Sequence, residues 1–141
     1  MGRVLIVDDN PANRKLLEAF CDAFGLETEV AETGEQALDR VAAHVMARAP
    51  ADGAEEAAAP APDAAPFGII FMDIHMPGLD GVETSRRLLA GPAAQTPIVA
   101  VTADVTAENR RRCLEAGIVE VVHKPISART LAPILCRYFD F

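Results

Sequence analysis

Two adjacent acids, Asp8 and Asp9, directly follow the apolar run at residues 4–7. A third acid, Asp73, follows a second apolar run at residues 69–72. Strands of a parallel sheet end at the same edge, so the three carboxylates are expected to meet in one crevice. Carboxylates that converge in this way repel one another unless a divalent cation neutralises them. The pattern therefore predicts a metal-binding acidic site.

A hydroxyl and an amine take similar positions later in the chain. Thr102 follows the apolar run at residues 97–101, and Lys124 follows the run at residues 119–122. A lysine amine can neutralise an anion, and a hydroxyl can donate a hydrogen bond to it. Together with the three acids, these two groups indicate phosphoryl chemistry on an aspartate.

Short strands and helices alternate along the chain. Strands are predicted at residues 3–7, 27–31, 68–72, 97–101 and 119–122, and the first, third and fourth are apolar throughout, as in strands covered on both faces. Helix caps and breakers separate these runs. The predicted helices run from Asn10 and Pro11 to Gly25, from Thr33 through Val45, over residues 80–90 and over residues 106–116. The last helix is predicted either to begin near Thr130 or to kink, because proline at position 133 is harmless only within the first turn of a helix.

This (βα)5 alternation predicts a single α/β domain over residues 1–141, with a parallel sheet covered by helices on both faces. One segment interrupts the alternation. Residues 47–66, between the second helix and the third strand, are mostly alanine with four prolines and four acids. They lack hydrophobic periodicity, which predicts a solvated insertion at the sheet end opposite the acids.

Composition excludes several classes of function. The chain has 141 residues, a net charge of −8 and 50% hydrophobic residues, which suits an acidic globular protein and argues against nucleic acid as a partner. The short basic stretch at residues 110–112 is interpreted as a solvated helix face. No membrane-spanning run or signal sequence is visible. Three cysteines, Cys21, Cys113 and Cys136, fall on predicted helices, which predicts buried free thiols and a cytoplasmic location.

The ordered set of motifs resembles the receiver domain of two-component response regulators. Asp8-Asp9, Asp73 followed by Met-Pro-Gly at residues 76–78, Thr102-Ala103 and Lys124-Pro125 carry the resemblance, which covers nearly the whole chain outside the insertion. The stretch FMDIHMPGLDG at residues 71–81 is similar to receivers attached to hybrid sensor kinases. The resemblance implies a flavodoxin-like, doubly wound sheet with strand order 2-1-3-4-5.

It also implies a role for each site residue. Asp73 would be the phosphoacceptor nucleophile. Asp9, Asp73 and the backbone carbonyl of His75 would bind Mg²⁺ directly, and Asp8 mainly through a metal-bound water. Lys124 would neutralise one phosphoryl oxygen, and Thr102 would donate a hydrogen bond to another.

Several positions depart from the receiver pattern or tune it. Receivers usually carry Tyr or Phe three residues before this lysine, where the chain has Val121, so the usual aromatic switch is in doubt. His75 and Asp104 occupy positions that influence the lifetime of the phosphoryl group in the family. The Lys-Pro peptide of receivers is commonly cis, which Pro125 permits here.

The resulting hypothesis is a stand-alone receiver that is not an enzyme with turnover. It would take phosphate from a histidine kinase or histidine phosphotransfer protein, then pass it on or bind a downstream target, as a cytoplasmic monomer or weak dimer without nucleic acid or membrane as partner. A receiver that binds its partner without phosphorylation is an alternative. A small metal-dependent phosphatase with an aspartyl-phosphate intermediate is another, although no second acid is placed as a general base. A flavodoxin-type flavin module is disfavoured, because Asp8, Asp9 and Asn10 would repel its phosphate.

Overall fold

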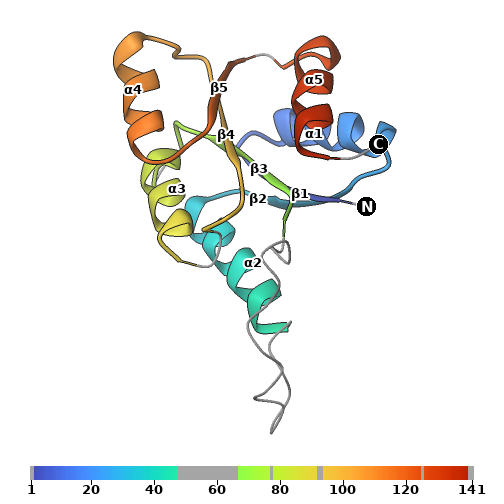
Figure 1. Ribbon diagram of the computed structural model, residues 1–141, viewed down its shortest axis with the longest axis horizontal. Coiled ribbons are helices and arrows are strands. Elements are labelled where there is room, and N and C mark those ends of the chain that lie inside the picture. Colours follow the sequence, from blue (N-terminus) through green and yellow to red (C-terminus); the bar gives the residue numbers. More distant parts are fainter. Residues whose placement is uncertain (1, 48–66, 77, 92–93, 125, 140–141) are drawn as a thin grey trace, which may run out of the picture.

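A computed structural model describes residues 2–47, 67–76, 78–91, 94–124 and 126–139 of the chain. Over these residues, five strands alternate with five helices (Figure 1). In chain order the elements are β1 (Arg3–Val7), α1 (Pro11–Ala23), β2 (Glu27–Ala31), α2 (Gly34–Ala47), β3 (Ile69–Asp73), α3 (Gly81–Leu89), β4 (Ile98–Thr102), α4 (Ala107–Glu115), β5 (Glu120–His123) and α5 (Ala128–Tyr138). The predicted (βα)5 alternation is confirmed.

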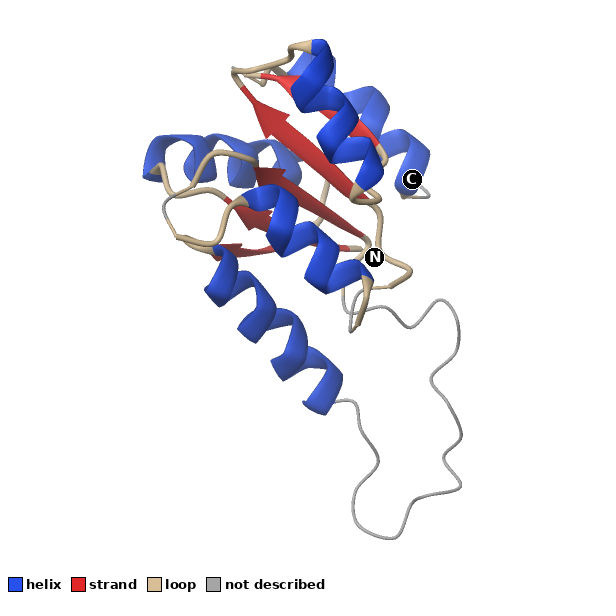
Figure 2. Cartoon of the chain, turned by 90° about the vertical axis from the view of Figure 1, so that its left-hand side faces the viewer, coloured by secondary structure: helices blue, strands red, loops and turns tan. Residues whose placement is uncertain are grey.

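The strands form one parallel sheet in the order β2-β1-β3-β4-β5. Figure 2 shows the strands as arrows that run in a common direction. Strand β1 lies between β2 and β3, with Ile6 opposite Val30 on one side and Phe71 on the other. The predicted order 2-1-3-4-5 is confirmed. The winding direction therefore switches between β1 and β3, and a crevice is expected beyond the carboxyl ends of these two strands.

Helices cover both faces of the sheet (Figure 1). Helices α1 and α5 pack on one face, and α2, α3 and α4 pack on the other. Strand β1 serves both faces because successive side chains point to opposite sides: Val4 and Ile6 join the α1/α5 core, whereas Leu5 and Val7 join the other. Every residue of β3 and β4 is buried, so the prediction of strands covered on both faces is confirmed.

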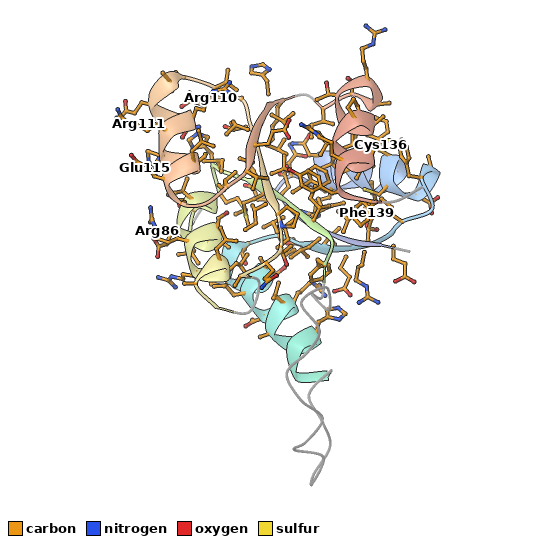
Figure 3. All side chains as sticks on the ribbon, in the orientation of Figure 1. Arg86, Arg110, Arg111, Glu115, Cys136 and Phe139 are labelled. Carbon is orange, nitrogen blue, oxygen red and sulfur yellow. The ribbon has the colours of Figure 1, made fainter. Side chains whose placement is uncertain are left out.

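One side-chain prediction on the α1/α5 face is wrong. In α1, Leu16 is 38% exposed and Leu17 next to it is buried. Cys136 was expected to be buried but lies exposed on α5 (Figure 3). It follows Leu135, which faces the sheet, and one residue turns a helix by about 100°. Cys21 and Cys113 are buried free thiols, as predicted.

Of the two alternatives predicted for the last helix, the start near Thr130 is wrong. Helix α5 begins at Ala128, capped by Ser127, whose hydroxyl accepts the Thr130 N–H at 3.3 Å. Pro133 therefore lies inside the helix, beyond its first turn. The exposed proline ring faces away from the sheet, while buried Leu131 anchors this part of the helix in the core. Burial of the apolar face outweighs the backbone hydrogen bond that proline removes.

The Ala/Pro-rich insertion predicted at residues 47–66 lies outside the described residues, apart from Ala47 at the end of α2. Its two flanks meet at one edge of the sheet. The His44 ring packs edge-on against Phe67 with ring centroids 5.1 Å apart, and the Gly68 N–H donates to the Arg3 carbonyl at 2.8 Å. This edge, where β1 and β3 begin, is opposite the edge that carries Asp73. Across the described residues, no helix combines the length and the apolar character needed to cross a bilayer.

Candidate functional site

The three predicted acids converge beyond the carboxyl ends of β1 and β3. These strands are neighbours, with Val7 opposite Met72, so the residues that follow each strand end lie side by side. One carboxylate oxygen from each of Asp8, Asp9 and Asp73 can be chosen so that all three lie within 4.8 Å of one another. Asp8 and Asp73 are 2% and 3% exposed, whereas Asp9 is exposed at the rim. The predicted acidic crevice is therefore present.

Lys124 joins the two buried carboxylates. Its Nζ lies 3.3 Å from Asp8 Oδ2 and 3.2 Å from Asp73 Oδ1. The lysine follows β5, which is separated from β3 by β4, and its backbone N–H donates to the Thr102 carbonyl at 2.9 Å. The flexible stem of the side chain spans this separation. A cation between two buried carboxylates offsets part of their mutual repulsion.

Further contacts fix the loop that carries Asp8. The Asn10 N–H donates to Asp8 Oδ1 at 2.8 Å, while the Asn10 side chain caps α1 by accepting the Ala12 N–H at 2.8 Å. The Arg14 guanidinium donates to the Asp8 carbonyl at 2.8 Å and lies 3.7 Å from Glu32. Sequence analysis missed Arg14, because its position one turn into α1 does not indicate that the side chain turns back toward β1.

Burial raises the pKa of Asp73 to about 6, and the neighbouring charge of Asp8 adds to this effect. The Lys124 ammonium and the hydrogen bond from the His75 N–H to Asp73 Oδ1, at 3.3 Å, act in the opposite direction. Without a metal, this carboxyl therefore keeps its proton into the mildly acidic range. At neutral pH it is ionised and can act as a nucleophile.

The loop after β3 shows why the motif at residues 71–81 carries glycines. A Cβ on Gly81 would lie 2.2 Å from the Asp73 carbonyl oxygen, so only glycine lets the start of α3 approach the end of β3 so closely. The Gly81 N–H donates to the Ile74 carbonyl at 2.9 Å, and Asp80 caps α3 by accepting the Glu83 N–H at 2.8 Å. These contacts hold the backbone of Asp73 in place. Pro77 lies outside the described residues.

Thr102 ends β4 and is fully buried. Its hydroxyl oxygen accepts the Asp104 N–H at 3.0 Å, which leaves the hydroxyl hydrogen available for donation. The Asp104 carboxylate in turn accepts the Thr106 N–H at 3.1 Å, and this bond lowers the pKa of Asp104. Thr102 therefore places a hydroxyl at this edge of the sheet, and the hydroxyl is tied to the loop between β4 and α4. Its donation to a phosphoryl oxygen stays a prediction.

Two tuning residues that the sequence places far apart face each other at the rim. His75 Nε2 lies 3.9 Å from Asp104 Oδ2, and both side chains are largely exposed. Their effect on phosphoryl lifetime stays a prediction.

Val121, which stands where receivers usually carry an aromatic residue, lies opposite Ala100 and packs partly buried against the core on the α2/α3/α4 face. Pro125, the residue of the predicted cis peptide, lies outside the described residues.

The donor set fits Mg²⁺. Hard carboxylate oxygens from Asp8, Asp9 and Asp73 approach one another closely, and a divalent cation would offset the repulsion between them. The His75 N–H donates to Asp73 Oδ1, and the role of the His75 carbonyl as a metal ligand stays a prediction. The basic stretch at residues 110–112 is a solvated helix face as predicted, and Figure 3 shows Arg110 and Arg111 pointing outward from α4.

Millimolar Mg²⁺ is expected to raise the melting temperature, because a ligand that binds only the folded protein stabilises it by mass action. At ten times Kd the gain is about 1.4 kcal/mol. Asp9→Ala should weaken this response strongly, whereas Asp22→Ala, which removes an exposed acid at the far end of α1, should leave it unchanged. Differential scanning calorimetry with EDTA or Mg²⁺ measures the shift. A wild-type melting temperature that ignores Mg²⁺ would contradict the site.

Comparisons with known proteins show what the chain is similar to. The family model described as the response regulator receiver domain matches residues 43–135. The chain is 35% identical over 136 residues to the signal transduction histidine-protein kinase BarA of Escherichia coli K12, and 33% identical over 140 residues to the sensor protein GacS of Pseudomonas syringae pv. syringae. Each alignment covers 96% of this chain but only 12% and 13% of the two kinases. The chain therefore spans a small part of the length of these relatives.

Solved structures of receiver proteins share the fold of this chain. Chemotaxis protein CheY4 of Vibrio cholerae superimposes with a TM-score of 0.76 and 25% identity, covering 99% of both chains. The receiver domain of sensor histidine kinase PA1611 from Pseudomonas aeruginosa PAO1 superimposes with a TM-score of 0.74 and 28% identity, covering 97% of this chain and 96% of that one. In the Pseudomonas structure a magnesium ion is coordinated in the active-site cleft.

Proposed function

Because the chain belongs to the response regulator receiver domain family of two-component signalling, we propose that Asp73 accepts a phosphoryl group from a phosphohistidine. One observation carries the proposal: Lys124 Nζ lies 3.2 Å from an Asp73 carboxylate that shares its crevice with Asp8 and Asp9. The donor is a histidine kinase or a histidine phosphotransfer protein. The chain then relays the phosphoryl group or binds a downstream target protein.

In the proposed reaction, an oxygen of ionised Asp73 attacks the phosphorus of the phosphohistidine. The new P–O bond gives an acyl phosphate, the P–N bond breaks, and the ring nitrogen keeps its electron pair. Mg²⁺ held by Asp8, Asp9, Asp73 and the His75 carbonyl would offset the repulsion between nucleophile and phosphoryl oxygens.

Two further side chains act on the phosphoryl group itself. Lys124 turns from the carboxylate pair toward a phosphoryl oxygen, and the free hydrogen of the Thr102 hydroxyl is donated to another. Both groups already lie at the carboxyl edge of the sheet, so only side-chain and loop movements are required. Charged groups and hydrogen-bond donors that are already in place can stabilise the charge that develops in the transition state.

The proposal concerns a phosphoacceptor and not an enzyme with turnover on small substrates. It assists its own phosphorylation and dephosphorylation, in the cytoplasm, where it meets its kinase as a monomer or weak dimer. Apart from Asp8, Asp9 and Asp73, no group of three metal-ligating side chains gathers in the part of the chain that the structure describes.

The test is a phosphotransfer profile against the histidine kinases and phosphotransfer proteins of the source organism. With radiolabelled donors and Mg²⁺, we expect rapid transfer from a small subset of donors and none in EDTA. Transfer from no donor, combined with specific binding to one of them, would instead favour the phosphorylation-independent receiver. Sustained hydrolysis of a small phosphate ester would favour the phosphatase.

Phosphorylation is expected to change the structure only locally. Val121 is too small to act as the aromatic switch of other receivers, and a small β-branched side chain offers no second buried position to occupy. Amide chemical shifts with and without beryllofluoride, a phosphoryl mimic, should therefore change mainly at residues 102–106 and at the start of α4. Large shifts along the whole of β5 and α5 would contradict weak coupling and indicate a conventional output switch.

A further inference from the structure

The loop between β4 and α4 is held on both sides of one residue, Asp104. On one side, the Asp104 N–H donates to the Thr102 hydroxyl oxygen at 3.0 Å. On the other, the Asp104 carbonyl accepts from the Asn109 side-chain amide, Nδ2, at 2.7 Å. Asp104 therefore links the buried hydroxyl at the end of β4 to a residue inside α4. The short second distance indicates a well-formed hydrogen bond.

Asn109 is built into this position. It is only 4% exposed, although it lies on a helix whose residues 107, 108, 110 and 111 are exposed. A buried amide costs free energy unless it is hydrogen-bonded, and the contact with Asp104 meets that need. The Asn109 N–H also donates to the Thr106 hydroxyl, at 3.3 Å, which caps α4. The side chain and the backbone of Asn109 thus both contact the loop.

We propose that Asn109 is a positioning residue that couples the Thr102 hydroxyl to α4. This inference rests on the proposed function, because it concerns how phosphorylation of Asp73 changes the structure outside the site. When Thr102 turns its hydroxyl toward a phosphoryl oxygen, its bond with the Asp104 N–H must move or break. Since the carbonyl of the same residue, Asp104, is held by Asn109, the displacement of Asp104 reaches the first turns of α4.

The coupling from Thr102 through Asp104 to Asn109 is especially important in this chain. Val121 cannot move between two buried positions as an aromatic side chain can. The chain therefore has no aromatic residue at the position that usually switches together with the threonine. The Asp104 side chain does not replace it, because its carboxylate accepts the Thr106 N–H within the same loop. Within the described residues, the bond from Asn109 to Asp104 is the side-chain contact that leads from this loop into α4 beyond the helix cap.

Substitution by aspartate isolates the donor. Asn109→Asp keeps the shape of the side chain but has no N–H to offer the Asp104 carbonyl, and an acid is tolerated near a helix N-terminus. Ala107→Asp is the matched control, because it adds the same charge to an exposed position of the same turn. Asn109→Ala removes the amide without adding charge and serves as a second variant if the aspartate protein does not fold.

The first measurement uses protein without metal or phosphate. Amide hydrogen exchange at Asp104 and Thr106 should become about two- to tenfold faster in Asn109→Asp and Asn109→Ala, as expected for the loss of one hydrogen bond. Exchange should be unchanged in Ala107→Asp. Equal exchange in wild type and both Asn109 variants would overturn the role of Asn109 whether or not Asp73 accepts phosphate, so this result is independent of the proposed function.

The second measurement adds Mg²⁺ and beryllofluoride and compares amide shifts within each protein. In wild type and Ala107→Asp, we expect shifts at residues 102–106 and through the first half of α4. In the Asn109 variants, the shifts at 102–106 should persist while those in α4 become smaller by about twofold or more. Undiminished α4 shifts would overturn the coupling. A wild-type protein that neither binds beryllofluoride nor takes up phosphate would contradict the proposed function instead, with exchange still testing the Asn109 contact.

Discussion

Asp73→Asn is expected to abolish phosphorylation. Wild-type protein incubated with acetyl phosphate and Mg²⁺ should gain one phosphoryl group by intact-mass spectrometry, and the variant should gain none. Asparagine preserves the size of the side chain and one oxygen that can accept hydrogen bonds, but its amide is not a nucleophile at neutral pH. Asp22→Asn, at an exposed position of α1, should be labelled like wild type.

The structure favours Asp73 over the two other acids of the crevice. Asp8 already accepts the Asn10 N–H through Oδ1 and contacts Lys124 through Oδ2. Asp9 is exposed at the rim. Both contacts recorded for the Asp73 carboxylate among the described residues go to Oδ1, which leaves Oδ2 for a new bond. Equal labelling of wild type and Asp73→Asn would move the phosphoacceptor to another residue.

In EDTA, the same substitution should stabilise the protein in a pH-dependent way. The folded protein holds the Asp73 proton to a pKa of about 6, whereas the unfolded chain releases it near the ordinary value of 3.8. Between these values the folded state binds more protons, so wild-type stability falls relative to Asp73→Asn as the pH rises. The pH-dependent part of the difference should be small at pH 4 and reach on the order of 3 kcal/mol above pH 6.

Urea unfolding of both proteins from pH 4 to pH 7.5 measures this difference. Acids outside this crevice titrate in the same range, but they contribute equally to both proteins and cancel on subtraction. Saturating Mg²⁺ should reduce or reverse the advantage of the variant at pH 7.5, because the cation binds the carboxylate that asparagine lacks. A stability difference that does not vary with pH would show that Asp73 titrates normally in the folded protein.

Local patterns in the sequence determined most of the fold. The apolar runs of β1, β3 and β4 predicted fully buried strands, because a strand covered on both faces has no polar side. Capping residues determined helix starts for the same local reason: Asn10 and Asp80 accept backbone N–H groups two or three residues away. Once five strands alternate with helices, a parallel sheet follows, and acids placed just after two strands must share an edge.

Contacts between distant segments were decided only by the tertiary structure. The exposure of Leu16 and Cys136 depends on how far α1 and α5 rotate about their axes when they pack, which hydrophobic periodicity gives only approximately. The start of α5 shows the same limit, since packing of Leu131 on the sheet holds a helix that Pro133 alone would shorten. Local propensity is worth little against such burial.

Some features of the site could be predicted from the sequence, and others could not. The sequence by itself determined that Asp8, Asp9, Asp73, Thr102 and Lys124 lie at one edge, because each follows a strand and a parallel sheet brings its strand ends together. It could not show that Lys124 bridges two of the carboxylates or that Asn109 holds the Asp104 carbonyl. Those contacts depend on side-chain rotamers and loop paths, which are selected by packing among segments far apart in the chain and not by neighbours in the sequence.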